Sequence, residues 1–161
     1  MDQKNYPLAI ATAAELRNRG IEFLWYVIGE GFDRPILEAL IQKESLENCF
    51  KMIGLRSNPY QYMQIADIIV MTSKFEGRSI ALDEAKILNK LIVTTNYTSA
   101  TDVVTNGETG LICEMTAQAV ANAICKLNSD KSLAKHIFSQ LQEKNWDNTN
   151  EVEKYLLAIE K

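Results

Sequence analysis

The chain has few of the residues that build metal sites, disulfide frameworks or membrane spans. Its 161 residues include three cysteines and one histidine, and no CxxC pair occurs. Cys49, Cys113 and Cys125 are far apart and lie among apolar neighbours, so we expect buried free thiols in a reducing compartment. No apolar run approaches the roughly 20 residues of a spanning helix, and no secretion signal opens the chain. The sequence therefore predicts a soluble, cytoplasmic protein.

Basic residues are also scarce relative to acidic ones. The formal net charge is -4 at pH 7, and no Lys/Arg-rich run occurs. A protein that binds nucleic acid through its phosphates needs a basic face, so this class of function is excluded. His136 lies in a segment expected to be a C-terminal helix and has no partner ligands, so we expect it on the surface or in packing.

What the chain does contain is a regular alternation of helix and strand signals. Strands are expected at 21–29, 48–55, 67–73, 90–95 and 109–114. Helices are expected at 7–20, 33–45, 58–66, within 74–86, and at 99–107, 116–130, 131–145 and 150–161. This alternation predicts an α/β fold, a parallel sheet with helices on both faces, followed by C-terminal helices.

The length suits one domain, residues 1–161, with a sizeable core. The chain opens almost directly on a helix, so a first strand is missing from the expected pattern. We therefore expect a domain cut from a longer protein.

Ligands of open parallel sheets bind outside the carboxyl ends of the strands. These ends are expected at 29–35, 54–60, 73–80 and 95–100, and each is rich in glycine or hydroxyl residues. Backbone N–H groups at the following helix starts favour anions such as phosphate. Gly29 and Gly31 fit a phosphate turn or simply a tight turn, and Arg34 stands where a dinucleotide motif needs its third glycine.

The most informative stretch is "KFEGRSIALDEAK", residues 74–86. Wound as a helix, it predicts one apolar stripe with Glu84 in its middle, and Asp83 and Lys86 away from it. The expected members of this stripe are Ile80, Ala81, Ile87, Leu88 and Leu91. A carboxylate on a core-facing stripe must be paired or face a polar cavity.

Two interpretations remain open for these acids. Glu84 could form a structural ion pair, cap the backbone or line a ligand pocket. Glu76, taken alone, could be an ordinary acid in a surface loop. With Gly77 and Ser79 as an N-cap, the pair predicts a site for sugar hydroxyls and phosphate.

These residues resemble a known family. "FEGRSIALDEA" resembles the E-x7-E segment of retaining glycosyltransferases of the GT-B architecture, family four or group one. "DQKNYPLAI", "VIGEG", the stretch "MIGLRSNPYQYMQIADIIVMTSKFEG" and "NGETGLI" resemble other segments of the same family in the same order. The resemblance covers nearly the whole chain and implies the C-terminal, Rossmann-like, donor-binding half of a GT-B enzyme.

The resemblance also implies residue roles. Glu76 would be the catalytic residue and would accept hydrogen bonds from donor-sugar hydroxyls, Glu84 would bind the ribose, and Lys4 would pair with the diphosphate. Leu55 and Tyr60 would lie near the nucleoside base. The remaining donor-sugar and phosphate contacts would come from Gly29, Gly31, Gly77, Arg78, Ser79 and Ile80.

The implied substrate is a nucleotide sugar such as a UDP- or GDP-sugar, with no metal ion because no DxD motif occurs. The parent enzyme would build a bacterial capsule, exopolysaccharide or lipopolysaccharide, and would associate with the cytoplasmic face of the membrane. Its N-terminal acceptor domain is not in this chain, so we expect the isolated chain to be inactive and to form a dimer through exposed apolar surface.

Three departures from the family pattern and three alternative functions remain. Asp102 stands where the family often has glutamate, Ser79 replaces a frequent proline, and the usual arginine upstream of the lysine is absent. The alternatives are a non-catalytic Rossmann-like interaction module, a domain of a GT-B epimerase, and a sugar phosphorylase, although no pyridoxal-lysine motif is recognisable.

Overall fold

The computed structural model describes residues 3–144 and 146, and its elements follow the expected alternation. The strands are β1 (Trp25–Ile28), β2 (Phe50–Gly54), β3 (Ile68–Met71), β4 (Leu91–Thr95) and β5 (Leu111–Cys113). The helices are α1 (Tyr6–Asn18), α2 (Arg34–Lys43), α3 (Tyr60–Ile65), α4 (Ile80–Ile87), α5 (Ala100–Val103), α6 (Ala117–Ser129) and α7 (Lys131–Glu143). The helix expected at 150–161 lies outside the described residues.

All strand pairs are parallel, as predicted, but they form two ladders. β1 pairs with β2, while β3, β4 and β5 form a second sheet in that order. The sequence predicts one sheet. The difference arises between β1 and β3, whose residues line an apolar groove instead of pairing with each other.

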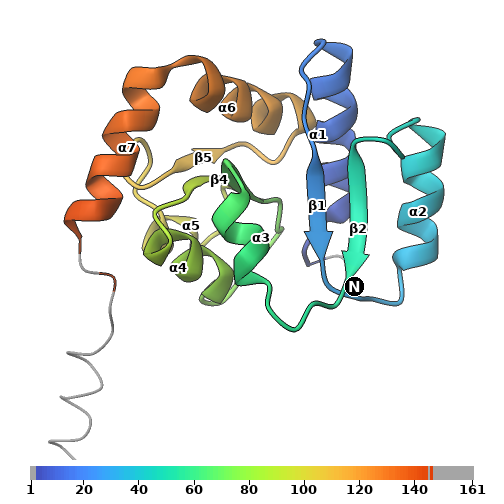
Figure 1. The fold of residues 1–161 in the computed structure, drawn as a ribbon, viewed down its shortest axis with the longest axis horizontal. Coiled ribbons are helices and arrows are strands. Elements are labelled where there is room, and N and C mark those ends of the chain that lie inside the picture. The colour runs from blue at the N-terminus through green and yellow to red at the C-terminus, as the bar shows by residue number, and fades with distance from the viewer. Residues whose placement is uncertain (1–2, 145, 147–161) are drawn as a thin grey trace, which may run out of the picture.

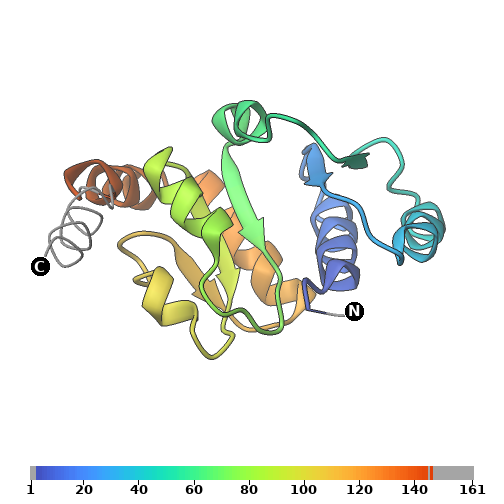
Figure 2. The same cartoon turned by 90° about the horizontal axis from the view of Figure 1, so that it is seen from below.

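Helices cover both faces of the three-stranded sheet. α6 lies on one face and α4 on the other (Figures 1 and 2). β4 is the central strand, and its residues Ile92–Thr95 are all buried, which agrees with its almost continuous apolar sequence. The α/β fold class with helices on both faces is therefore confirmed.

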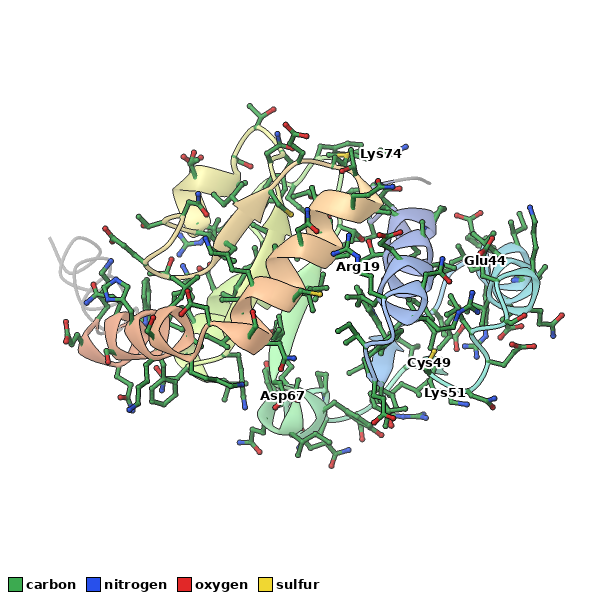
Figure 3. All side chains as sticks on the ribbon, turned by 90° about the horizontal axis from the view of Figure 1, so that it is seen from above. Arg19, Glu44, Cys49, Lys51, Asp67 and Lys74 are labelled. Carbon is green, nitrogen blue, oxygen red and sulfur yellow. The ribbon has the colours of Figure 1, made fainter. Side chains whose placement is uncertain are left out.

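A separate core holds α1 and α2 against β1 and β2. It includes Ala13 of α1, Leu37 and Ile41 of α2, and Val27 and Phe50 of the strands. α1 also packs along α6, where Arg19 Nη1 donates to Asn122 Oδ1 at 2.7 Å. This helix pair joins the two ladders on one side of the molecule (Figure 3).

The last two helices begin at side chains that cap them. Thr116 Oγ1 accepts from the N–H of Ala119 at the start of α6. Asp130 accepts from the N–H groups of Ser132 and Leu133 at the start of α7. Such caps satisfy donors that the helix itself leaves unpaired.

Several smaller predictions can be compared with the structure. The three cysteines are free, but they are half-buried rather than fully buried, and burial raises the pKa of the Cys113 thiol to about 11. His136 is exposed on α7. Trp146 is half-buried against the core beside α7, and its indole N–H donates to Leu141 O, so this side chain is a packing anchor. No helix among the described residues is both long and apolar enough to cross a membrane.

Candidate functional site at the carboxyl ends of the strands

The start of the chain is tied to the carboxyl end of β3. The N–H of Lys74 donates to Gln3 O at 2.8 Å, and Thr72 Oγ1 donates to Lys4 O at 3.0 Å. These bonds place Lys4 beside the turn that leads from β3 to α4. That turn holds Glu76 and was expected to carry the site.

Glu76 lies in the middle of a polar cluster. Its Oε1 accepts from Lys4 Nζ at 2.7 Å and from Ser73 Oγ at 2.7 Å, and its Oε2 accepts from Gln3 Nε2 at 3.2 Å. The Glu76 side chain is 7% exposed, whereas the Lys4 side chain is 48% exposed. The structure thus brings together Lys4 and Glu76, which were both expected at the site.

The contacts keep this acid ionised. Burial alone would raise the pKa of Glu76, but hydrogen bonds from Lys4 and Ser73, the Lys4 charge and the Gln3 amide hold that pKa below its ordinary value. A buried carboxylate with three donors around it is fixed in both charge and direction. It is therefore suited to accept further hydrogen bonds from a neutral polar ligand.

Hydroxyl groups from β4 and from the segment after it bond the backbone of this turn. Ser99 Oγ donates to Glu76 O at 2.8 Å and lies 3.1 Å from Gly77 O. Thr95 Oγ1 donates to Ser73 O at 2.6 Å. Sequence reasoning selected 95–100 as a strand end but did not single out these hydroxyls. Their signal was a run of Ser and Thr directly after a buried strand.

The predicted N-cap of α4 is confirmed in position but not in chemistry. Ser79 is the N-cap residue, yet its hydroxyl makes no capping bond and lies 3.4 Å from Met71 Sδ as a donor. Ser79 is 3% exposed, so its side chain points into the core instead of toward the helix start. Ile80, the first residue of α4, is 70% exposed.

The predicted apolar stripe of α4 is wrong. Ile80 and Ile87 are 70% and 56% exposed, and the buried face is made by Leu82, Ala85 and Lys86. Helical periodicity alone could not choose between these faces, because both carry apolar residues. Glu84 therefore lies on the half-exposed side of α4, and the core does not surround it.

Lys86 is buried because each part of it has a partner. Its Nζ donates to Val103 O at 3.0 Å, lies 2.8 Å from Asp83 Oδ1, and stands 4.5 Å from the centre of the Trp146 ring. Burial opposes ionisation of Asp83, but Lys86 and Arg78 hold its pKa below the ordinary value. The sequence predicted that Lys86 lies away from the packed face of α4. This prediction is wrong, because Lys86 is buried.

Glu84 has a partner of its own at the same edge. The hydroxyl of Tyr60 in α3 donates to Glu84 Oε1 at 2.9 Å, and this contact raises the pKa of Tyr60. Leu55, which follows β2, is 73% exposed. The structure brings Glu84 and Tyr60 together, both of which were expected near the nucleoside.

The glycines after β1 form a separate turn. The N–H of Gly29 donates to Gly54 O at 3.0 Å, and both glycines have positive φ angles, 134° and 74°. Arg34 holds this turn, since its guanidinium bonds Glu30 Oε1 at 2.6 Å and Met52 O at 2.8 Å. Gly31 lies on the exposed side of the same turn.

The remaining expected site residue is exposed. Arg78 pairs with Asp83 at 2.8 Å, and its side chain is 67% exposed. Within residues 3–144 and 146, no cluster of three or more His, Cys, Asp or Glu side chains is arranged to hold a metal ion.

Comparison with known proteins identifies the family of this chain. The glycosyl transferases group 1 family matches residues 1–144, and the chain therefore belongs to this family. The likeness to solved structures includes the Anabaena protein HepE in complex with UDP, with a TM-score of 0.87 at 20% identity. It covers 99% of this chain and 46% of HepE, and it shows the shared GT-B fold.

Two curated relatives come from bacterial glycan synthesis. An N-acetylgalactosaminyltransferase acting on a diphospho-undecaprenol-linked sugar in Campylobacter jejuni is 32% identical over 113 residues, 70% of this chain. The capsular polysaccharide biosynthesis glycosyltransferase CapM of Staphylococcus aureus is 38% identical over 82 residues, 50% of this chain. The matches span 30% and 22% of these two relatives.

Proposed function

We propose that this chain is the C-terminal, nucleotide-diphosphosugar-binding domain of a retaining glycosyltransferase of the E-x7-E type. The observation that carries the proposal is the pair of carboxylates at one edge of the sheet. Glu76 is held by Lys4, and Glu84 by Tyr60, at the place where open parallel sheets bind ligands.

The two carboxylates would bind different parts of the nucleotide sugar. Glu76, fixed by Ser73 and Gln3, would be the catalytic residue of the donor side and, as a carboxylate, would accept hydrogen bonds from hydroxyls of the donor sugar. Glu84 would accept from the ribose hydroxyls, with Tyr60 and the exposed Leu55 beside the base. The backbone amides of Gly77, Arg78, Ser79 and Ile80 at the start of α4 would face the sugar and the diphosphate.

Lys4 would exchange partners when the donor binds. In this structure its ammonium bonds Glu76, and a diphosphate would compete for that charge. Ser73 and Gln3 remain to hold Glu76 when Lys4 turns to the phosphates. A cation at the diphosphate stabilises negative charge that develops on the leaving nucleotide, so no metal ion is required for this step.

The proposed biological role follows the relatives. Their names place them in capsular polysaccharide and lipid-linked glycan synthesis. We propose that the parent of this chain transfers a sugar from a UDP- or GDP-sugar to a bacterial surface polysaccharide, at the cytoplasmic face of the membrane. A second domain would supply the acceptor site, so the isolated chain would bind donor without transferring it.

Thermal unfolding with and without nucleotide tests the donor-site proposal. UDP, GDP and ADP are each added to the chain, with uridine as the control that lacks phosphate. The matching nucleotide at 100 times its Kd should stabilise the fold by about 2.7 kcal/mol. Glu84→Ala should abolish this shift, while the exposed Glu47→Ala, at the opposite edge of the sheet, should leave it unchanged. No shift with any nucleotide would overturn the proposal and favour a non-catalytic module.

A further inference from the structure

Two polar contacts tie α3 to α4 and to the turn that follows α4. At the N-terminal end of α3, the Tyr60 hydroxyl donates to Glu84 Oε1 at 2.9 Å. At its C-terminal end, Lys90 Nζ donates to Gln64 O. Between these ends, Met63 packs against the core cluster to which α4 contributes. No residue of α3 is buried, so these contacts fix how α3 lies relative to α4.

Glu84 depends on Tyr60 for its direction. Its side chain lies on the half-exposed side of α4, whereas Glu76 is 7% exposed and has three donors around it. Among residues 3–144 and 146, the Tyr60 hydroxyl is the one hydrogen-bond donor that reaches the Glu84 carboxylate. A glutamate side chain has several rotatable bonds, and fixing them costs conformational entropy. Without Tyr60, a ligand that bound Glu84 would have to meet this cost itself.

Tyr60 is itself fixed at the start of α3. Its N–H donates to Asn58 Oδ1 at 3.1 Å, a turn in which an asparagine side chain bonds the backbone two residues on. The hydrogen bond to Glu84, and then the charge of that carboxylate, raise the pKa of the Tyr60 phenol. The phenol therefore stays protonated at neutral pH and remains a hydrogen-bond donor.

The contact with Tyr60 leaves Glu84 open to a ligand. A carboxylate has two oxygens and can accept about four hydrogen bonds, and Tyr60 takes one of them at Oε1. Oε2 and the remaining lone pair of Oε1 can accept from two adjacent hydroxyls at once. The 2′- and 3′-hydroxyls of a ribose are such a pair of donors.

We propose that Tyr60 is a positioning residue, which directs Glu84 so that its carboxylate selects a ribonucleotide over a nucleotide whose sugar lacks both hydroxyls. This inference rests on the proposed function, which assigns the ribose to Glu84. Tyr60 acts through the carboxylate. A direct contact between Tyr60 and the base would instead be independent of the sugar, and competition between Tyr60 and the ribose for Glu84 would weaken binding.

The test compares two nucleotides and two matched variants by calorimetric titration. The nucleotides are UDP and 2′,3′-dideoxy-UDP, or the corresponding GDP pair if GDP is the nucleotide that binds. Tyr60→Phe removes the hydroxyl and keeps the ring. Tyr62→Phe is the control, because it makes the same change in the same helix, and the Tyr62 hydroxyl accepts from Arg56 Nε at 3.2 Å instead of contacting Glu84. Thermal unfolding establishes that both variants are folded.

In the wild type, loss of both ribose hydroxyls should weaken binding roughly tenfold or more, because hydrogen bonds to a charged group are lost. Tyr60→Phe should weaken UDP binding about threefold to tenfold and change the affinity for dideoxy-UDP by less than about twofold. The ratio of the two dissociation constants should therefore fall in Tyr60→Phe and stay at the wild-type value in Tyr62→Phe.

Equal weakening of both nucleotides by Tyr60→Phe would overturn the proposal, because Tyr60 would then contact the base or only stabilise α3. Unchanged or tighter UDP binding in this variant would also overturn it, as would an equal fall of the ratio in Tyr62→Phe. Equal wild-type affinities for UDP and dideoxy-UDP would overturn this inference and leave nucleotide binding in place. If the wild type binds no nucleotide, the proposed function is wrong, and this inference is wrong with it.

Discussion

Lys4 and Glu76 are 72 positions apart in the sequence, and their side chains meet at 2.7 Å. The contact joins the segment before α1 to the turn after β3. It forms at the edge of the sheet where the strands end, and it buries the carboxylate while leaving the ammonium half-exposed. A ligand with negative charge can therefore reach Lys4 without unfolding the turn.

The stability that Glu76 provides should depend on pH. Its pKa in the folded chain is lowered, and the unfolded value is about 4.3, so the stabilising contribution is fully present above the unfolded pKa. It should be lost as pH falls through the lower, folded pKa. The difference in Tm between wild type and Glu76→Gln should thus be constant from pH 7 to 5 and shrink below about pH 4. A difference that grows on acidification would contradict this assignment.

Replacing Lys86 should lower the free energy of unfolding more than replacing an exposed cation does. Lys86→Ala removes the partners of Val103 O, Asp83 and the Trp146 ring together. We expect a loss of about 2 kcal/mol in the free energy of unfolding. Arg78→Ala, whose exposed side chain also pairs with Asp83, should cost no more than about 0.5 kcal/mol. Urea unfolding measures the loss of unfolding free energy in each variant. Equal losses in the two variants would show that the buried contacts of Lys86 add no stability beyond that of an exposed ion pair.

Gly54 should be required for its backbone conformation. Its φ is +74°, and a Cβ there would lie 2.7 Å from Glu30 Oε1. Gly54→Ala should destabilise the chain by about 1–2 kcal/mol. Gly31→Ala is the control, because its φ is outside the left-handed range and no atom lies within 4 Å of the added Cβ. Thermal unfolding should therefore separate the two variants, and a neutral Gly54→Ala would show that the turn readjusts freely.

Ser99 should affect ligand binding more than stability. Its hydroxyl bonds the carbonyl of Glu76 and lies near that of Gly77, so Ser99→Ala frees the turn that presents Glu76. We expect nucleotide-sugar affinity to fall several-fold, corresponding to about 1 kcal/mol for one neutral hydrogen bond. Calorimetric titration measures the affinity, with the exposed Ser139→Ala on α7 as control. Unchanged affinity in Ser99→Ala would mean that β4 alone fixes the turn.

The fold was predictable because its strands and helices carry unambiguous local signals. The continuous apolar runs 67–73 and 90–95 predicted buried strands; β4 is buried from Ile92 to Thr95, whereas only Met71 of β3 is buried. The α/β alternation predicted their parallel pairing. The separation into two ladders could not be predicted, because it depends on whether β1 and β3 pair with each other. No residue pattern within either strand reports that.

The candidate site was predictable in its location but only partly in its contacts. Glu76 and Glu84 both lie at the carboxyl edge of the sheet, as the sequence predicted, and Lys4 and Tyr60 are their direct partners. The predicted orientation of α4 was wrong, because two of the partners that allow Lys86 to be buried, Val103 O and the Trp146 ring, lie far from it in sequence. The role of Ser99 was not predicted, because the sequence of a loop does not show which carbonyl groups a serine hydroxyl will contact.

The central claim is that a nucleotide diphosphate binds at the edge formed by Lys4, Glu76 and Glu84. Titration of the isotope-labelled chain with UDP and GDP, followed by ¹⁵N NMR, tests it most directly. We expect the largest shifts on the amides of residues 76–81, with further shifts at Leu55 and at the Gly29–Gly31 turn. Shifts confined to other surfaces, or no saturable shift with either nucleotide, would contradict it.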